Sequence, residues 1–76
     1  MKTYSFRFRG CEKGAIGTQN NTFHKTVEAD NLKEANLMLY DTHDHISFIG
    51  GQITITEDNK VLEMLRGWEE IKGYLI

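Results

Sequence analysis

Residues 2–9 alternate between the two sides of an extended chain. Tyr4, Phe6 and Phe8 fall on one side of an extended chain, and polar residues occupy the positions between them: Thr3, Ser5, Arg7 and Arg9. Successive side chains of a β-strand point to opposite faces, so this period of two indicates a sheet with one buried face and one face in water. The buried face needs a covering layer, which predicts a two-layer α+β domain with a charged open sheet face.

The chain has 76 residues, enough for one small domain over residues 1–76. Its hydrophobic content of 39% and charged content of 26% are typical of folded chains and not of disordered ones. The longest apolar run, residues 37–40, is far shorter than the roughly 20 residues of a membrane span. Charges stand where a signal peptide is apolar, and a single cysteine gives no disulfide framework. These features predict a cytoplasmic protein without membrane contact.

The net charge of −2 conceals an uneven distribution along the chain. Residues 1–27 carry five basic and one acidic side chain, a net charge of +4, whereas residues 28–76 carry four basic and ten acidic ones, a net charge of −6. An acidic second half of this kind is suited to a basic groove on a partner. Whether the asymmetry is also one in space depends on the fold.

The segment between the first strand and the helix contains a loop and a second strand. Residues 10–20 hold three glycines and few apolar residues, which predicts a loop. Residues 22–29 then alternate again, with Phe23, Val27 and Ala29 on one side together with Lys25. We expect this segment to pair antiparallel with the first strand.

Asn31 marks the start of the strongest helix signal. Asn is a good N-cap residue, and Glu34 stands three positions later, as in a capping box. Helical spacing then predicts one apolar stripe: Leu32, Ala35, Met38, Leu39, Thr42 and Ile46. The helix is expected to end near residues 41–44 and to be about 20 Å long.

After two glycines, residues 52–56 alternate strictly and predict a third strand. Asp58-Asn59 suits a two-residue hairpin turn because both residues tolerate positive φ. This turn would place Ile55 opposite Leu62 and Ile53 opposite Met64, all on the core side.

The alternative interpretation of this region is a helix over residues 59–72 with one apolar face: Val61, Leu65, Trp68, Ile71 and Leu75. We favour the hairpin because its pairs match. Residues 67–72 are then expected to form a helical turn, and residues 74–76 to pack back or to pair with a sheet edge. The predicted fold is therefore an antiparallel β-β-α-β-β sheet on one main helix, with a short C-terminal helical turn or strand.

One predicted surface lies on the outer side of the main helix. Leu37 falls roughly opposite the apolar stripe, and Tyr40 lies beside it three residues on. Charged residues surround the pair: Lys33, Asp41 and Asp44. An exposed apolar pair ringed by charges is typical of a small protein-binding patch. The alternatives are an isolated surface leucine, or a pair covered by residues 68–76.

A second predicted surface is basic. Arg7 and Arg9 share the open sheet face, and Lys13 and Lys25 add charge from the same hairpin. Arginine forks match phosphate oxygens, which indicates nucleic-acid contact. Sheets that bind single strands usually carry aromatic residues on the same face, and here the aromatics lie opposite. The alternative is cross-strand pairing of an arginine with Glu28.

Residues 41–45 place two histidines and two aspartates close together. On a helix only Asp41 and His45 share a face, so one ion cannot collect all four groups, and we interpret the cluster as a solvated helix end. Residues 10–17 lack the order of a phosphate-binding loop, and no histidine is placed beside Cys11 as a base. The prediction is a protein that is not an enzyme and that holds no metal or cofactor.

Residues 26–35, TVEADNLKEA, form the junction between the second strand and the capped helix. Together with the order of strand, glycine loop, strand and helix, this junction resembles very small phage and bacterial α+β proteins of the anti-CRISPR type. The resemblance implies a phage-encoded inhibitor that occludes a host complex handling nucleic acid. The predicted function is a protein-interaction module with a protein partner, or with a second copy of itself. A small nucleic-acid-binding protein is the alternative.

Overall fold

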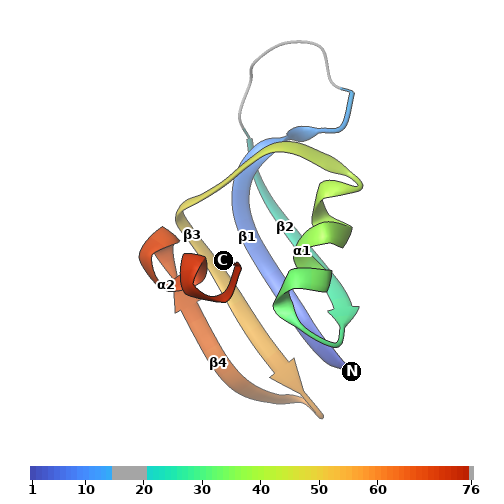
Figure 1. The fold of residues 1–76 in the computed structure, drawn as a ribbon, viewed down its shortest axis with the longest axis vertical. Coiled ribbons are helices and arrows are strands. Elements are labelled where there is room, and N and C mark those ends of the chain that lie inside the picture. Colours follow the sequence, from blue (N-terminus) through green and yellow to red (C-terminus); the bar gives the residue numbers. More distant parts are fainter. Residues whose placement is uncertain (15–20, 76) are drawn as a thin grey trace.

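A computed structural model describes residues 1–14 and 21–75, which form four strands and two helices. The elements are β1 (Lys2–Glu12), β2 (Asn21–Ala29), α1 (Leu32–Tyr40), β3 (His43–Glu57), β4 (Lys60–Arg66) and α2 (Gly67–Leu75). All neighbouring strands are antiparallel, and their order in the sheet is β2-β1-β3-β4 (Figure 1). The central strands are therefore β1 and β3, and the two edges of the sheet are β2 and β4.

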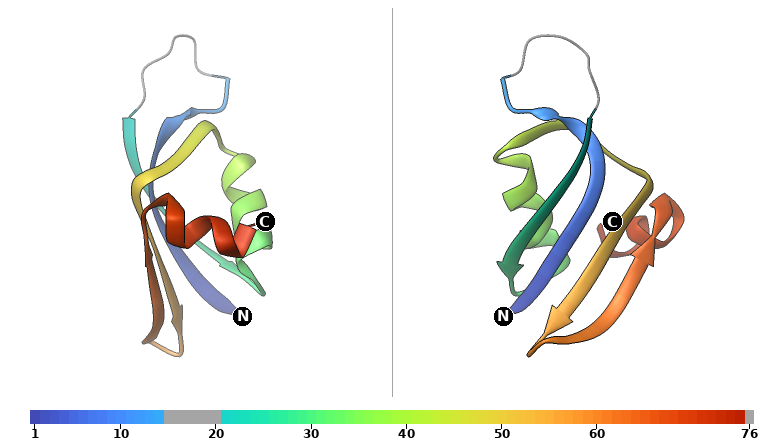
Figure 2. Two further views of the ribbon diagram at one scale, coloured as in Figure 1. Left: turned by 60° about the vertical axis from the view of Figure 1, so that its left-hand side comes forward. Right: turned by 180° about the vertical axis from the view of Figure 1, so that it is seen from behind.

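Both helices cover the same face of the sheet. Viewed from behind, the sheet stands in front of α1 and α2, and its other face is left open (Figure 2). The predicted α+β class and the antiparallel sheet are thus confirmed. The element order is β-β-α-β-β-α, so the prediction of one main helix with a short C-terminal turn or strand is wrong in that detail.

The second helix forms because the chain turns sharply out of β4. Gly67 has a φ of +73°, a conformation that suits glycine, and it redirects the chain over the sheet. The Glu70 carboxylate then accepts a hydrogen bond from the Arg66 backbone N–H at 2.7 Å, which caps the first turn. Ile71 faces inward and is fully buried, so α2 is held by burial as well as by its cap.

The aromatic side of β1 forms the centre of the core. Tyr4, Phe6 and Phe8 are each at most 2% exposed, as the alternation predicted. The buried apolar cluster joins all six elements: Tyr4, Phe6, Phe8, Val27, Ala29, Leu32, Ala35, Leu39, Phe48, Ile53, Ile55, Leu65 and Ile71. Burial of this set from both layers is the main stabilising contribution in a domain of this size.

Helix α1 begins as predicted and ends earlier than predicted. The Asn31 side chain accepts a hydrogen bond from the Glu34 N–H at 2.9 Å, which confirms the cap. The helix ends at Tyr40, so Thr42 and Ile46 are not part of it, and Met38 is 42% exposed. The prediction that Met38, Thr42 and Ile46 belong to the buried stripe is wrong. A nine-residue helix, about 14 Å long, buries only three side chains here, those of Leu32, Ala35 and Leu39.

The residues after α1 extend β3 instead of the helix. Strand β3 is 15 residues long and pairs with β1 through two register shifts. Its path requires Gly51, because a Cβ there would lie 2.4 Å from the Arg7 carbonyl oxygen. Gly10 is similarly close to the Asp44 carbonyl oxygen, at 2.9 Å, and is buried within β1. The predicted loop therefore starts after Glu12 and not at Gly10, and residues 15–20 lie outside the described residues.

Strand β4 confirms the hairpin but not its register. Ile53 lies opposite Leu65, so the predicted pairs Ile55–Leu62 and Ile53–Met64 are wrong. The pairing skips Leu62, and this irregularity moves every later residue by one position. As a result Leu65 is 4% exposed, whereas Leu62 is 52% exposed and Met64 is 42% exposed.

The turn between β3 and β4 has the predicted conformation. Asp58 and Asn59 both have positive φ, at 50° and 63°. The alternative helix over residues 59–72 is therefore wrong over its first half, which is strand, and right only after Arg66. Neither helix of the described residues is long and apolar enough to cross a bilayer.

Candidate functional site

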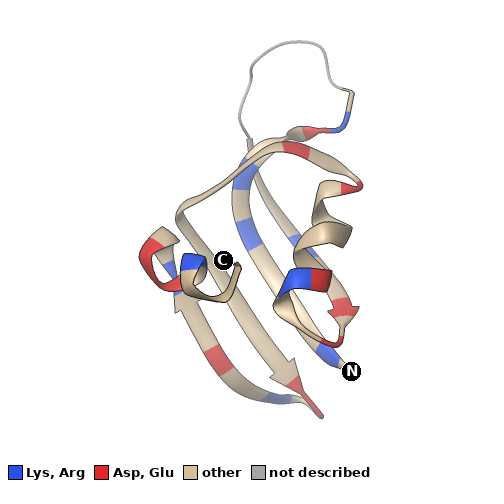
Figure 3. Ribbon diagram, viewed as in Figure 1, with Lys and Arg blue, Asp and Glu red and all other residues tan. Residues whose placement is uncertain are grey.

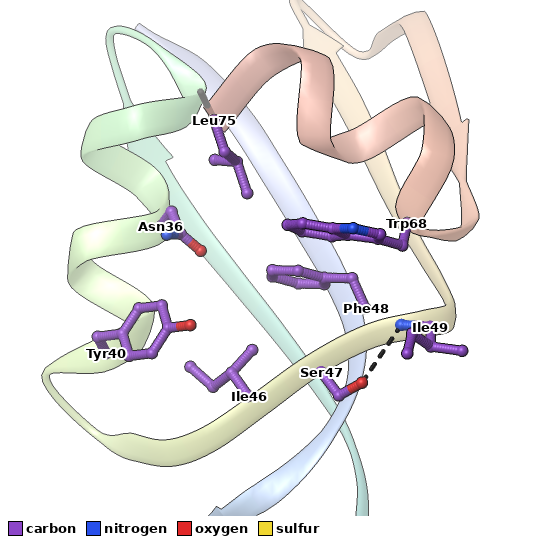
Figure 4. A pocket seen from close by; sticks show the side chains of 8 residues that line it. All are labelled: Asn36, Tyr40, Ile46, Ser47, Phe48, Ile49, Trp68 and Leu75. Atoms are coloured by element: carbon purple, nitrogen blue, oxygen red, sulfur yellow. Dashed lines mark hydrogen bonds between the residues drawn. The ribbon is translucent and has the colours of Figure 1, made fainter.

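A groove of about 420 Å³ lies between the two helices and the first half of β3. Figure 4 shows the side chains that line it, which are Asn36, Tyr40, Ile46, Ser47, Phe48, Ile49, Trp68 and Leu75. Most of this lining is aliphatic or aromatic. Concave, mainly apolar surfaces of this size with a few polar groups are the usual form of a binding site.

The irregular part of β3 builds the floor of the groove. Phe48 is buried beneath it, and the next residue, Ile49, turns outward and is 74% exposed. The Ser47 hydroxyl accepts a hydrogen bond from the Ile49 backbone N–H at 3.4 Å, and Gly50 follows with a φ of +73°. A regular strand would alternate these side chains between the two faces, so the local turn is what brings Ile49 to the groove.

The two helices supply the walls. Tyr40 of α1 and Trp68 of α2 lie on opposite sides of the groove (Figure 4), and they are 42% and 40% exposed. Both rings combine a large apolar surface with one polar atom, a combination that is enriched at protein interfaces. Two exposed aromatic rings facing one hollow are the strongest indication of a binding site in this molecule.

Asn36 adds a polar group between these walls. Its side-chain oxygen is buried and, within residues 1–14 and 21–75, is the one such atom without a hydrogen-bond partner. The oxygen points from α1 toward the groove in Figure 4. An acceptor buried without a donor costs roughly 1–3 kcal/mol. This unpaired oxygen is therefore a destabilising feature of the α1 wall.

The predicted protein-binding patch lies at the outer rim of this groove. Lys33, Leu37 and Tyr40 occupy neighbouring positions on the outer side of α1, where Leu37 is 66% exposed. Asp41 follows as the C-cap and is exposed. Asp44 does not join them, because it belongs to β3, pairs with Cys11 and is half-buried.

The alternative that residues 68–76 cover the Leu37–Tyr40 pair is wrong in that both side chains stay exposed, although Trp68 and Leu75 line the same groove as Tyr40. Sequence reasoning missed Ile49 as part of this groove. The sequence predicts only a helical turn for residues 67–72 and assigns no element to Ile49. The available signal was a tryptophan between a glycine and two glutamates, at the start of a helical turn. Only the packing of α2 against β3 brings these side chains to one place.

The open sheet face carries a basic row that crosses all four strands. Arg7 of β1 lies between His24 of β2 and Gln52 of β3, and Gln52 in turn lies opposite Arg66 of β4. Arg9 stands two residues along β1 on the same face. Figure 3 shows the corresponding basic bands on β1.

The two lysines of the predicted basic site are not on this face. The Lys25 ammonium donates a hydrogen bond to the Thr42 hydroxyl, on the helix side of the sheet. The Lys13 ammonium donates to the Tyr40 carbonyl oxygen at 3.3 Å, at the C-terminus of α1 where a cation is favourable. The structure therefore brings together Arg7 and Arg9 and separates both from Lys13 and Lys25.

His43 and Cys11 both pack against neighbouring residues of the fold. The His43 ring packs edge-on against Phe8 and Phe23, with centroids 5.2 and 4.7 Å apart. Cys11 is buried and donates a weak hydrogen bond to the Asp44 carbonyl oxygen at 3.5 Å. Among the described residues no three potential ligands of a metal ion converge, including those of residues 41–45.

Known proteins offer no guide to the choice between these surfaces. Comparison of the chain with protein-family models, with curated proteins and with solved structures gives no match. The function of this α+β domain therefore has to be inferred from its own groove and its own sheet face.

Proposed function

We propose that this chain is a non-enzymatic protein-interaction module that holds an apolar side chain of a partner in the groove between α1 and α2. The observation that carries the proposal is the pair of exposed aromatic rings, Tyr40 and Trp68, on facing walls of one apolar hollow. Exposed aromatic residues of this kind are enriched among the residues that dominate binding energy. Leu37, on the adjoining outer side of α1, extends the apolar surface beyond the groove.

The charge around the groove specifies the kind of partner. Residues 30–41 and 67–75 of the helix layer contain five acidic and two basic side chains, a net charge of −3. Lys13 and Lys25 lie on the same side of the sheet near the C-terminus of α1 and reduce this net charge to −1, so the acidic character is concentrated at α2. Lys72 of α2 is paired with Glu69 at 2.8 Å. Glu69 and Glu70 lie in the first turn of α2 (Figure 3), directly after the groove residue Trp68. The partner segment is therefore expected to be basic, with an aromatic or aliphatic anchor.

Occlusion of the partner is the proposed mechanism. It requires a complementary surface and no reacting group, which agrees with the buried state of Cys11 and the packed state of His43. The resemblance in plan to anti-CRISPR proteins favours a cytoplasmic, phage-encoded inhibitor of a host complex that handles nucleic acid. A homodimer formed through the same groove is the nearest alternative.

A peptide-display selection against the immobilised domain tests the proposal. We expect enrichment of peptides in which a large apolar residue is flanked by Lys or Arg. The double variant Leu37→Asp with Tyr40→Ala should lose this enrichment while keeping its circular-dichroism spectrum. Val61→Asp is the matched control, because Val61 is 61% exposed but lies on β4, away from the groove.

Two outcomes of this experiment would contradict the proposal. One is a selection without a consensus, and the other is the same consensus on the wild type and on the double variant. Analytical ultracentrifugation separates the homodimer alternative. A dimer that the double variant abolishes would make a second copy of this chain the occupant of the groove.

A further inference from the structure

We propose that the open sheet face is a second binding surface, for the phosphate backbone of duplex nucleic acid. The residues that would make the contacts are Arg7, Arg9 and Arg66, with His24 and Gln52 between and beside them. The arginines lie on the opposite side of the sheet from the two helices, and this surface meets the groove only at Ile49, which lines both.

The geometry of the sheet sets the spacing of these cations. Neighbouring strands lie about 4.8 Å apart, so the row from His24 through Arg7 and Gln52 to Arg66 spans roughly 14 Å. Arg9 lies about 6.7 Å from Arg7 along β1. The three guanidinium groups therefore originate from separate points on a broad, nearly flat face and can reach different phosphates of one backbone.

These cations have little competition from acidic side chains. By register the open face carries three arginines against a single glutamate, Glu28, although the whole chain has a net charge of −2. Glu28 lies opposite Thr3, four residues along β2 from His24. Within the described part of the chain the one ion pair is Lys72–Glu69, in the helix layer. The arginines are thus free to bind an external anion.

Two shallow hollows flank Arg7 on this face. One, of about 130 Å³, is lined by Ser5, Phe6, Arg7, His24, Gln52 and Thr54. The other, of about 80 Å³, is lined by Arg7, Phe8, Arg9, Thr22, Ile49, Gly50 and Gly51. Arginine and the hydroxyl and amide side chains of Ser, Thr and Gln are the usual contacts to phosphate oxygens. Each hollow therefore offers a cation with polar groups beside it.

The row from His24 to Arg66 contains no Phe, Tyr or Trp, which favours double-stranded over single-stranded nucleic acid as the ligand. The aromatic residues of β1, Tyr4, Phe6 and Phe8, are buried on the other side of the sheet. Unstacked bases of single strands need aromatic platforms, whereas the bases of a duplex are already stacked. Contacts to the backbone alone also predict binding that is independent of sequence.

The test is a fluorescence-anisotropy titration of a labelled 20-bp DNA duplex between 20 and 150 mM salt. If three arginines each neutralise one phosphate, the slope of log K against log salt is about −2.7. Arg7→Gln and Arg66→Gln should each make the slope shallower by about 1 and weaken binding at the lowest salt. Lys33→Gln is the matched control, because it removes one exposed cation from the helix layer.

Several results would overturn the proposal. They are no change in anisotropy at 20 mM salt, equal weakening by Lys33→Gln and Arg7→Gln, and tighter binding of a single strand than of the duplex. Equal binding of phosphatidylserine vesicles would show a general anion-binding surface instead. The double variant Leu37→Asp with Tyr40→Ala should bind the duplex like the wild type, so failure of the groove proposal remains distinguishable from failure of this one.

Discussion

Replacement of Leu65 by Ala, compared with replacement of Leu62 by Ala, tests the register of β4 on which both surfaces depend. Leu65 is 4% exposed and packs in the core, whereas Leu62 is 52% exposed at the irregularity of the strand. Removing a fully buried leucine side chain costs roughly 2–5 kcal/mol, from lost burial and from the cavity left behind. Replacing a half-exposed leucine costs under about 1 kcal/mol.

The expected loss is large for this domain. A chain of this length has a free energy of unfolding of about 4–11 kcal/mol, so a loss of about 3 kcal/mol from Leu65→Ala is roughly a quarter to three quarters of it. At about 4–8 °C per kcal/mol, a loss of about 3 kcal/mol lowers Tm by roughly 12–24 °C. Urea denaturation followed by circular dichroism gives both free energies, with the slope m as the check on two-state unfolding. A cost for Leu62→Ala equal to or above that of Leu65→Ala would refute the register and would restore the pairing expected from the sequence.

Three further predictions follow from single contacts. Gly51→Ala should destabilise the domain by at least about 2 kcal/mol, because the new methyl group would lie 2.4 Å from the Arg7 carbonyl oxygen, and an unchanged Tm would contradict this. Asn36→Leu should raise the free energy of unfolding by about 1 kcal/mol, since it removes the buried oxygen without a donor; a loss measured by urea denaturation would show that the amide is satisfied. The hydrogen bond to Glu63 raises the pKa of Tyr74, so the stabilising effect of this bond is complete below the unfolded pKa of about 10 and is lost as the pH rises through the folded pKa. In a spectrophotometric titration, Tyr74→Phe should therefore remove a phenol that ionises above about pH 10. If the missing phenol ionises at or below about pH 10, the contact is contradicted.

The parts of the fold that the sequence predicts correctly are those set by local patterns. The alternation around Phe6, the cap at Asn31 and the turn at Asp58 each depend on side-chain periodicity or on backbone conformations of a few residues. Such signals act within one element, and the structure retains them because burial and hydrogen bonding favour the same arrangement.

The errors arise where one residue changes the sheet face on which the later side chains of its strand lie. The pairing that skips Leu62 exchanges the faces of Met64 and Leu65, and no feature of the local sequence marks this irregularity. The predicted third strand starts after Gly51, whereas β3 runs through Gly51, which permits its close approach to β1. Long-range pairing decides both cases, and alternation alone does not contain it.

The candidate sites were predictable to different extents. The exposure of Leu37 and Tyr40 follows from helical geometry and was found, whereas the facing wall at Trp68 depends on where α2 packs. For the basic face, Arg7 was placed correctly by alternation, but Arg66 was not found because its strand had the wrong register. Tertiary pairing thus determines which residues complete each surface.

The most direct test of the central claim is the footprint of a selected basic peptide on the ¹⁵N-labelled domain by NMR. The account predicts chemical-shift changes at the Trp68 indole N–H, the Asn36 side-chain amide and residues 46–49. Amides around Arg7 on the open face should stay unchanged. Changes confined to the open face, or none at the indole N–H at a saturating peptide concentration, would contradict the claim that the groove between α1 and α2 holds the partner.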